Sequence, residues 1–238
     1  MKVRVRFSKL GIMKFIGHLD VMHFFQQLLR RSDIPIAYSS GLSPHQIMSF
    51  ALPLGIGLES IGEYMDIELT ERVSSEEAIR RMNLNSVNGI EILSFKELPE
   101  KAQNAMASVS AADYEICPGK TGFTADALKE GLSGLFSEKE IVVLKRTKKN
   151  EQEIDIKPFI YEHSVKEDGT VFLRLSCGSV NNIKPELVMG ALCKYMGAAA
   201  SDTGFAIKRL DLYREDILKP GEVSGRFISL DSTGEPIK

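Results

Sequence analysis

The sequence is organised around three motifs: FIGHLD at residues 15–20, YSSGLSPH at residues 38–45 and GEYMD at residues 62–66. Two of the four histidines, His18 and His45, lie in the first two motifs. The glycines and the proline of these motifs are typical of tight turns. Between the first two motifs runs the longest helical stripe of apolar residues in the chain. We therefore expect any binding or catalytic site to lie within residues 15–66.

The residues around the first motif predict a strand followed by a helix. Residues 2–8 alternate basic and apolar side chains, which is the pattern of a strand with one buried face. Gly11 interrupts this strand, and Asp20 favours the N-cap of a helix, although Gly17 or His18 could begin it a turn earlier. An apolar stripe with the helical repeat then continues to a double arginine at 30–31, where we expect the helix to end.

The remaining pattern predicts an α+β fold. The first half reads β-α-β-β-α-β with an elaborated middle, and the second half repeats this order without detectable sequence identity. We therefore predict two tandem ferredoxin-like (βαββαβ) units, each with two helices on one face of its sheet. The expected first unit spans residues 1–100 and contains the GHLD and SPH motifs. The expected second unit spans 101–218, with the boundary somewhere within residues 98–112, and residues 219–238 are expected to form a flexible tail.

Composition indicates an ordinary soluble globular protein. Hydrophobic residues make up 43% of the 238 residues and charged residues 26%, and no apolar run approaches the length of a membrane span. The first residues do not resemble a signal peptide, so we expect a cytoplasmic protein without membrane contacts. The three cysteines are odd in number and widely spaced, which favours free thiols in a reducing compartment.

Charge is unevenly distributed along the chain, although the net charge is only −2. Residues 1–50 contain seven Lys or Arg against two acids, whereas residues 51–100 contain four against ten. Such asymmetry can mark one face for an anionic partner and another for a protein partner. The alternative interpretation is that both runs form ordinary solvated surface.

Seven short motifs form a pattern that is specific only as a set. They are FxKxG at 7–11, FxGHLD at 15–20, RR at 30–31, YSxGxxPH at 38–45, PLG at 53–55, GEYxD at 62–66 and DIKP at 155–158. Together they resemble the radical-SAM-linked domain family of unknown function, over most of residues 1–214. The resemblance implies a companion of a radical S-adenosylmethionine (radical SAM) enzyme, either as a separate protein or fused behind that enzyme. The chain departs from the family pattern at Ser43, where Asn is expected.

Eight residues are candidates for a ligand-binding site. A helix start attracts anions, and a proline beside a histidine limits the movement of the imidazole. We predict that His18, Tyr38 and His45 converge on one cleft, with Asp66 or Arg31 at its rim. The full set is His18, Asp20, Arg30, Arg31, Tyr38, Pro44, His45 and Asp66.

The two histidines leave three interpretations open. They could belong to a pocket for a phosphate or nucleotide, or they could act as acid and base on a ribose 2′-hydroxyl, because an imidazole pKa near 6.5 suits both roles. They could also be structural, with His18 capping the helix and His45 bonding a loop carbonyl. We expect no metal site and no cofactor, since the chain lacks close histidine pairs, phosphate-binding loops and the CxxxCxxC motif of a radical SAM enzyme.

Four basic residues near the amino terminus are candidates for nucleic-acid binding. Lys2, Arg4 and Arg6 are expected on the exposed face of the first strand, with Lys9 following them. Cations in a row along one strand can contact successive phosphates.

Three functions from different classes follow from these patterns. The first is a non-catalytic accessory protein that partners a radical SAM enzyme and presents its substrate, RNA or a ribonucleoprotein. The second is a metal-independent endoribonuclease of the tandem ferredoxin-like type that uses His18 and His45. The third is a plain protein-interaction module that uses the acidic region 59–77.

Overall fold

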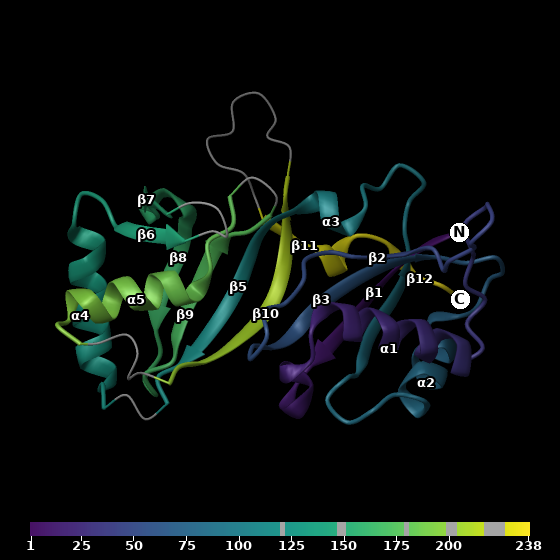
Figure 1. Cartoon of the computed structure of the whole chain (residues 1–238), viewed down its shortest axis with the longest axis horizontal. Helices are drawn as coiled ribbons and strands as arrows, with labels where there is room; N and C mark the ends of the chain where they lie inside the picture. The colour runs from purple at the N-terminus through teal and green to yellow at the C-terminus, as the bar shows by residue number, and fades with distance from the viewer. Residues whose placement is uncertain (120–121, 147–150, 179–180, 199–203, 217–226) are drawn as a thin grey trace. The chain divides into compact units, whose positions relative to one another are not determined.

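The structure of the protein is a computed structural model that describes residues 1–119, 122–146, 151–178, 181–198, 204–216 and 227–238. The chain divides into two compact units: unit 1 contains residues 1–110 and 210–238, and unit 2 contains residues 111–209 (Figure 1). Both units combine strands and helices, so the fold class is α+β, as the sequence predicts. The first segment of unit 1 ends at Ser110. The return of residues 210–238 to unit 1 was not predicted.

Unit 1 is built on an antiparallel sheet. The strand order is β12-β4-β1-β3, and the short strand β2 pairs with part of β3. The elements of unit 1 are β1 (Lys2–Lys9), the 3-10 helix η1 (Gly11–Phe15), α1 (His18–Arg31), β2 (Met48–Phe50), β3 (Glu59–Glu68), α2 (Ser75–Leu84), β4 (Ile92–Glu97), α3 (Ala105–Ser108), β11 (Phe227–Ser229), the 3-10 helix η4 (Leu230–Ser232) and β12 (Glu235–Pro236).

One face of this sheet carries the hydrophobic core of unit 1. Alternation along β1 directs Val3, Val5 and Phe7 toward α1 and α2, and all three are buried. The rings of Phe7 and Phe25 lie 4.5 Å apart between centroids, which places the middle of α1 directly on the strand. Figure 1 shows α1 and α2 on the same side of these strands. The apolar stripe found in the sequence is therefore the buried face of α1.

The start of α1 lies at the earlier of the expected positions. Gly17 is the N-cap, and the Asp20 carboxylate accepts a hydrogen bond of 3.3 Å from the Gly17 backbone N–H. Asp20 is thus the third residue of the helix rather than its cap. It still satisfies a backbone donor at the positive end of the helix dipole.

The other face of the sheet is covered, contrary to the expectation that it is exposed. Arg4 is only 2% exposed and forms a bidentate ion pair with Asp66, with N–O distances of 2.8 and 3.0 Å. The Arg4 guanidinium also donates to the carbonyls of Leu230 and Gln103. Two other segments of unit 1, residues 98–108 and the carboxyl-terminal residues, therefore cover this face of β1.

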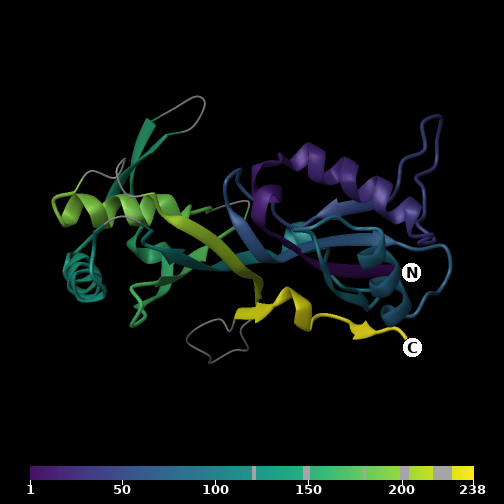
Figure 2. The ribbon, with the colours of Figure 1, turned by 90° about the horizontal axis from the view of Figure 1, so that it is seen from below.

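The carboxyl-terminal residues are part of unit 1 rather than a flexible tail. Strand β11 pairs with residues 213–215 of β10, and β12 pairs with β4. Leu230 is fully buried, and Ile237 joins the hydrophobic core of unit 1. Both chain ends lie on unit 1, as Figures 1 and 2 show. Residues 219–226 of the expected tail lie outside the described residues.

Polar side chains hold this segment against the sheet. The Tyr64 hydroxyl donates to Asp211, and burial is the main cause that raises the pKa of Tyr64 above its usual value. Asp231 accepts from Ser94 at 2.5 Å and from Lys96 at 3.1 Å, and lies 3.9 Å from Arg6. Arg6 and Lys96 on this face are therefore compensated inside unit 1.

Unit 2 contains its own antiparallel strands and a separate hairpin. Strand β9 pairs with β5 on one side and β8 on the other, while β6 and β7 form a two-stranded sheet. The elements that lie in or extend into unit 2 are β5 (Val109–Cys117), α4 (Ala125–Ser137), β6 (Val142–Arg146), β7 (Glu151–Asp155), the 3-10 helix η2 (Lys157–Phe159), β8 (Ile160–Val165), β9 (Val171–Ser176), α5 (Pro185–Tyr195) and β10 (Ala206–Glu215).

Glycines in α4 allow the two helices of unit 2 to approach closely. A Cβ atom on Gly131 would lie 2.7 Å from the sulfur of Met196, just after α5. The helix propensity lost at this position is therefore offset by packing against α5. At the carboxyl end of α4, Phe136 stacks on His163 of β8 with 3.6 Å between ring centroids.

The Arg4–Asp66 pair provides a test of the covered face. Substituting either partner alone leaves a buried charge without compensation, so Arg4→Ala and Asp66→Ala should each lower the free energy of unfolding by about 3–5 kcal/mol. Urea unfolding of the two single variants and the double variant measures this cost and its coupling. Purely additive costs would show that the two side chains do not act as a pair.

The stacked histidine predicts a pH dependence of stability. Burial lowers the pKa of His163 below its usual value of about 6.5, so protonation favours the unfolded state. This contribution to stability is fully present above pH 6.5 and is lost as the pH falls through the lower folded-state pKa. Calorimetry between pH 5 and pH 8 should therefore show a smaller loss of Tm on acidification for His163→Gln than for the unchanged protein. Identical pH profiles would contradict the assignment.

Candidate functional site

The predicted site residues of the first motif lie at the amino end of α1. The His18 ring meets Phe50 edge to face, with 5.4 Å between ring centroids. It also lines a cavity of about 20 Å³ together with Lys9, Glu63 and several apolar side chains. This cavity holds about one water molecule and is too small for a nucleotide.

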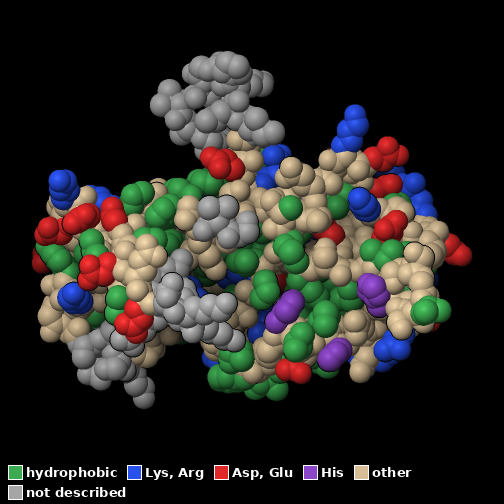
Figure 3. All heavy atoms as spheres, turned by 45° about the horizontal axis from the view of Figure 1, so that its top comes forward, with side chains coloured by type: hydrophobic (Ala, Val, Ile, Leu, Met, Phe, Trp, Pro, Cys, Tyr) green, Lys and Arg blue, Asp and Glu red, His purple; other side chains and the backbone are tan. Residues whose placement is uncertain are grey.

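His45 lies in the turn between residues 38 and 46, which is bound to the middle of α1. Its Nδ1 atom is 2.9 Å from the Ser39 hydroxyl, and Tyr38 forms a β-bridge with Gln46. The Gln46 side chain donates to the carbonyl of Gln26, which fixes this turn against the middle of α1. Gln26 follows His18 by eight residues, or about 12 Å along the helix axis. Figure 3 accordingly shows the histidine side chains of this face separated from one another.

The other candidates for ligand binding are distributed over two further places. Arg30 and Arg31 are exposed at the carboxyl end of α1, and Pro44 is exposed in the turn before His45. Asp66 lies on the opposite face of the sheet, where it binds Arg4. It cannot form the rim of a cleft that contains His18. The structure therefore does not bring the eight residues into one pocket, and their roles in ligand binding stay predictions.

The four candidates for nucleic-acid binding are also in different surroundings. Arg4 and Lys9 are both buried, and the Lys9 ammonium donates to the carbonyl of Ile16 at 2.9 Å. Arg6 is partly buried against Tyr64, with its guanidinium 5.9 Å from the ring centroid. Lys2 is exposed. The expectation of a row of solvent-exposed cations is therefore wrong for Arg4, because sequence alternation does not reveal what covers a strand face.

The acidic region 59–77 is not a continuous charged surface. Glu63 is buried, Asp66 is paired with Arg4, and Glu77 binds both Arg80 and Arg81. Hydrogen bonds from Arg80 and then Arg81 lower the pKa of Glu77 to about 2. Several acidic side chains of this region are therefore buried or paired within unit 1.

An exposed apolar surface near the start of α1 was not anticipated from the sequence. None of the five residues of η1 is buried, and Ile12, Phe15 and Leu19 are 78%, 65% and 64% exposed. Ile56 and Val87 are also exposed, at 67% and 42%. We call Ile12, Phe15, Leu19, Ile56 and Val87 the apolar end of unit 1. Figure 3 shows hydrophobic side chains at the surface beside the histidines of this face.

The backbone beneath the apolar end is held by several hydrogen bonds. The Gly57 N–H donates to the carbonyl of Lys14 at 2.8 Å, and the Gly11 N–H donates to the Glu59 carboxylate at 3.1 Å. On the other side, the Leu10 N–H donates to the carbonyl of Gly89 at 2.8 Å. These bonds connect η1 with the turns at 55–58 and 87–91. The apolar side chains are therefore presented from a defined backbone.

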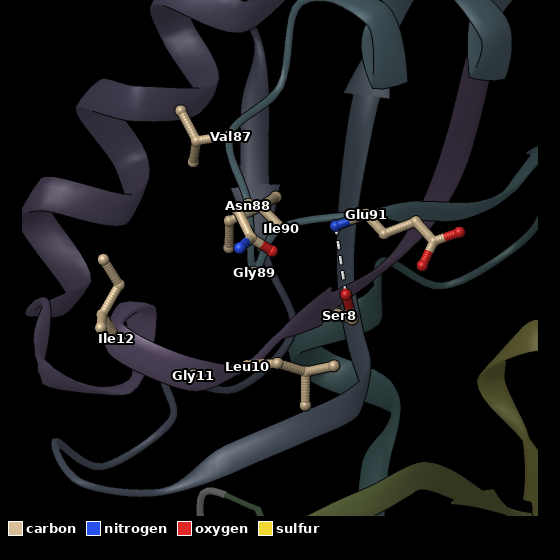
Figure 4. A pocket seen from close by; sticks show the side chains of 9 residues that line it. All are labelled: Ser8, Leu10, Gly11, Ile12, Val87, Asn88, Gly89, Ile90 and Glu91. Atoms are coloured by element: carbon tan, nitrogen blue, oxygen red, sulfur yellow. Dashed lines mark hydrogen bonds between the residues drawn. The ribbon is translucent and has the colours of Figure 1, made fainter.

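A groove of about 550 Å³ lies beside the apolar end (Figure 4). It is lined by Ser8, by residues 10–12 and by residues 87–91. Ile12 and Val87 belong both to the groove and to the apolar end. The Ser8 hydroxyl accepts from the Glu91 backbone N–H at 3.1 Å and joins the two walls at one end.

No group of three or more His, Cys, Asp or Glu side chains is placed to hold a metal ion among the described residues. No described helix has both the length and the apolar character needed to span a membrane. The prominent features are an exposed apolar surface and an adjoining groove.

These observations define the class as a two-unit α+β protein with an exposed apolar surface on its first unit. The chain belongs to the family described as an uncharacterized protein conserved in bacteria (DUF2344), whose sequence model matches residues 2–185. The match includes the apolar end and both walls of the groove. No curated protein matches the chain.

The separation of the two histidines predicts that they act independently. His18→Ala removes an edge contact with Phe50 and should cost about 0.5–1.5 kcal/mol, whereas His45→Ala at an exposed turn should cost less. Thermal unfolding of the single and double variants should give additive changes within about 0.5 kcal/mol. A larger coupling would place the two imidazoles in one site.

Proposed function

We propose that the protein is a non-catalytic accessory partner of a radical SAM enzyme and that it docks on this enzyme through the apolar end of unit 1. The sequence resemblance supports a radical SAM enzyme as the partner. The exposed side chains of the apolar end support docking through an apolar interface.

The observation that carries this proposal is the exposure of large apolar side chains at adjoining positions. Phe15 and Leu19 flank the start of α1, Ile12 lies on η1, and Ile56 lies in the 55–58 turn that is hydrogen-bonded to Lys14 of η1. Contiguous apolar surface of this kind marks protein interaction sites, whereas single exposed apolar residues are ordinary. Since the supporting backbone is hydrogen-bonded, little ordering is needed on binding, which favours affinity.

We also propose that both units are ferredoxin-like. The strand order β4-β1-β3-β2 with α1 and α2 on one face supports this for unit 1. In unit 2, the order of β5, β9 and β8 with α4 and α5 supports a second βαββαβ unit into which the β6–β7 hairpin is inserted. Such a scaffold offers a sheet for stability and loops for recognition.

Presentation of RNA or a ribonucleoprotein to the enzyme is the further part of this proposal. It rests on the sequence alone, because Arg4 and Lys9 make their contacts inside unit 1. The endoribonuclease alternative needs two imidazoles at one ribose. Gln26, which binds the turn that contains His45, lies about 12 Å from His18 along the axis of α1. This spacing opposes the alternative.

Capture of the partner from the native cell tests the docking surface. The tagged full-length protein should copurify with a radical SAM enzyme, identified by mass spectrometry. The double variant Phe15→Ser/Leu19→Ser should reduce this capture at least about tenfold, because central apolar anchors dominate interface energies.

The matched control is Met106→Ser, which changes an apolar residue of α3 that is 58% exposed. This variant should capture the enzyme as the unchanged protein does. Absence of any radical SAM enzyme, or equal loss with both variants, would overturn the proposal.

A further inference from the structure

We infer that the groove beside the apolar end binds an extended peptide segment in which an aliphatic side chain is next to Lys or Arg. This inference rests on the proposed function, since the segment would belong to the docked partner. It names the chemistry that the partner must present.

The size and walls of the groove suit a short peptide. A volume of about 550 Å³ lies within the usual range of ligand sites and accommodates a few residues. Figure 4 shows Leu10 and Ile12 on one side, and Val87, Asn88 and Ile90 across from them on the turn that follows α2. The apolar side chains therefore provide an environment for one aliphatic side chain.

The polar group inside the groove is suited to a peptide backbone. Asn88 lies in a turn closed by a hydrogen bond of 3.1 Å from the Ile90 N–H to the Val87 carbonyl. Its side-chain amide makes no hydrogen bond with any described residue. An amide offers one carbonyl acceptor and two N–H donors, which match the N–H and C=O of an extended main chain.

A charge at the edge of the groove favours a basic neighbour for the aliphatic residue. Figure 4 shows the Glu91 side chain extending away from Asn88, Leu10 and Ile12. Glu91 is exposed, and its carboxylate has no hydrogen bond or ion pair with a described residue. It is the sole titratable side chain lining the groove in the described chain. The ammonium of Lys14, in η1, lies 3.9 Å from Glu59 and is compensated by it. A partner cation close to Glu91 therefore meets a carboxylate without a competing intramolecular cation.

Gly89 fixes the width of the groove. Its φ is +97°, and a Cβ atom at this position would collide with the carbonyl of Leu10. The absence of a side chain lets the turn pack directly on the residue before η1. The two walls are thus joined at Leu10 and Gly89 as well as at Ser8 and Glu91, so that the groove is formed before a peptide enters.

The test uses NMR titration of the ¹⁵N-labelled full chain with two blocked peptides, acetyl-Gly-Leu-Lys-Leu-Gly-amide and its counterpart with Glu in place of Lys. The Lys peptide should shift amide signals of residues 8–12 and 87–91, and it should bind about threefold more tightly than the Glu peptide. The variant Glu91→Gln should remove this preference, and Asn88→Ala should weaken both peptides. The control Glu71→Gln changes an exposed acid beyond the opposite end of β3 and should alter neither result.

Shifts outside the groove, or equal affinities for the two peptides, would overturn the inference. Its failure is distinguishable from failure of the proposed function. If Phe15→Ser/Leu19→Ser abolishes enzyme capture while Glu91→Gln and Asn88→Ala leave capture unchanged, docking stands and the groove assignment is wrong. If the peptides bind in the groove as described and no radical SAM enzyme is captured, the groove chemistry stands and the partner is wrong.

Discussion

The ion pair between Arg4 and Asp66 connects four separate parts of unit 1. The Arg4 guanidinium binds the carboxylate of the adjacent strand β3 and the carbonyls of Gln103 and Leu230. Asp66 in turn accepts from the backbone N–H of Ala105 at the start of α3, at 2.7 Å. A charge buried in this way is tolerated only when its donors are satisfied, so the pair requires both covering segments to be in place. The carboxyl-terminal residues consequently belong to the fold of a sheet that begins more than 200 residues earlier in the chain.

The fold class and the buried faces could be predicted from local patterns. Alternation at residues 2–8 identified Val3, Val5 and Phe7 as the buried side of β1, and the helical stripe identified Phe25 and its neighbours as the buried side of α1. These signals are local, because a strand or helix with one apolar face must bury it. The covering of the opposite face could not be predicted, since it depends on Leu230, in a segment whose glycines and prolines indicate a loose terminus. A basic residue on an alternating strand has the same pattern whether it faces water or a buried carboxylate.

The site was less predictable than the fold for a related reason. His18 and His45 occur in turn-rich motifs, and both lie along α1, but convergence on one ligand is a three-dimensional property. The contact of Gln46 with Gln26 sets their spacing, and nothing in the motif spacing specifies it. One feature of the sequence could have indicated the exposed side chains of the apolar end. Ile12 and Phe15 lie between Gly11 and Gly17, outside both the strand alternation and the helical stripe, so neither periodicity gives them a buried position.

The contrast between the two faces of unit 1 constrains how it can recognise a partner. On the covered face, Arg4 and Lys96 bind carboxylates of the same unit, so long-range attraction of an anionic partner is weakened there. At the apolar end, Phe15 and Leu19 remain exposed on a hydrogen-bonded backbone although the core of unit 1 is formed without them. Their exposure adds nothing to folding and increases the tendency to associate, which supports the proposal that a partner covers them. Recognition through apolar area depends weakly on ionic strength, and the carboxylate of Glu91 at the adjoining groove would then select among apolar partners by charge.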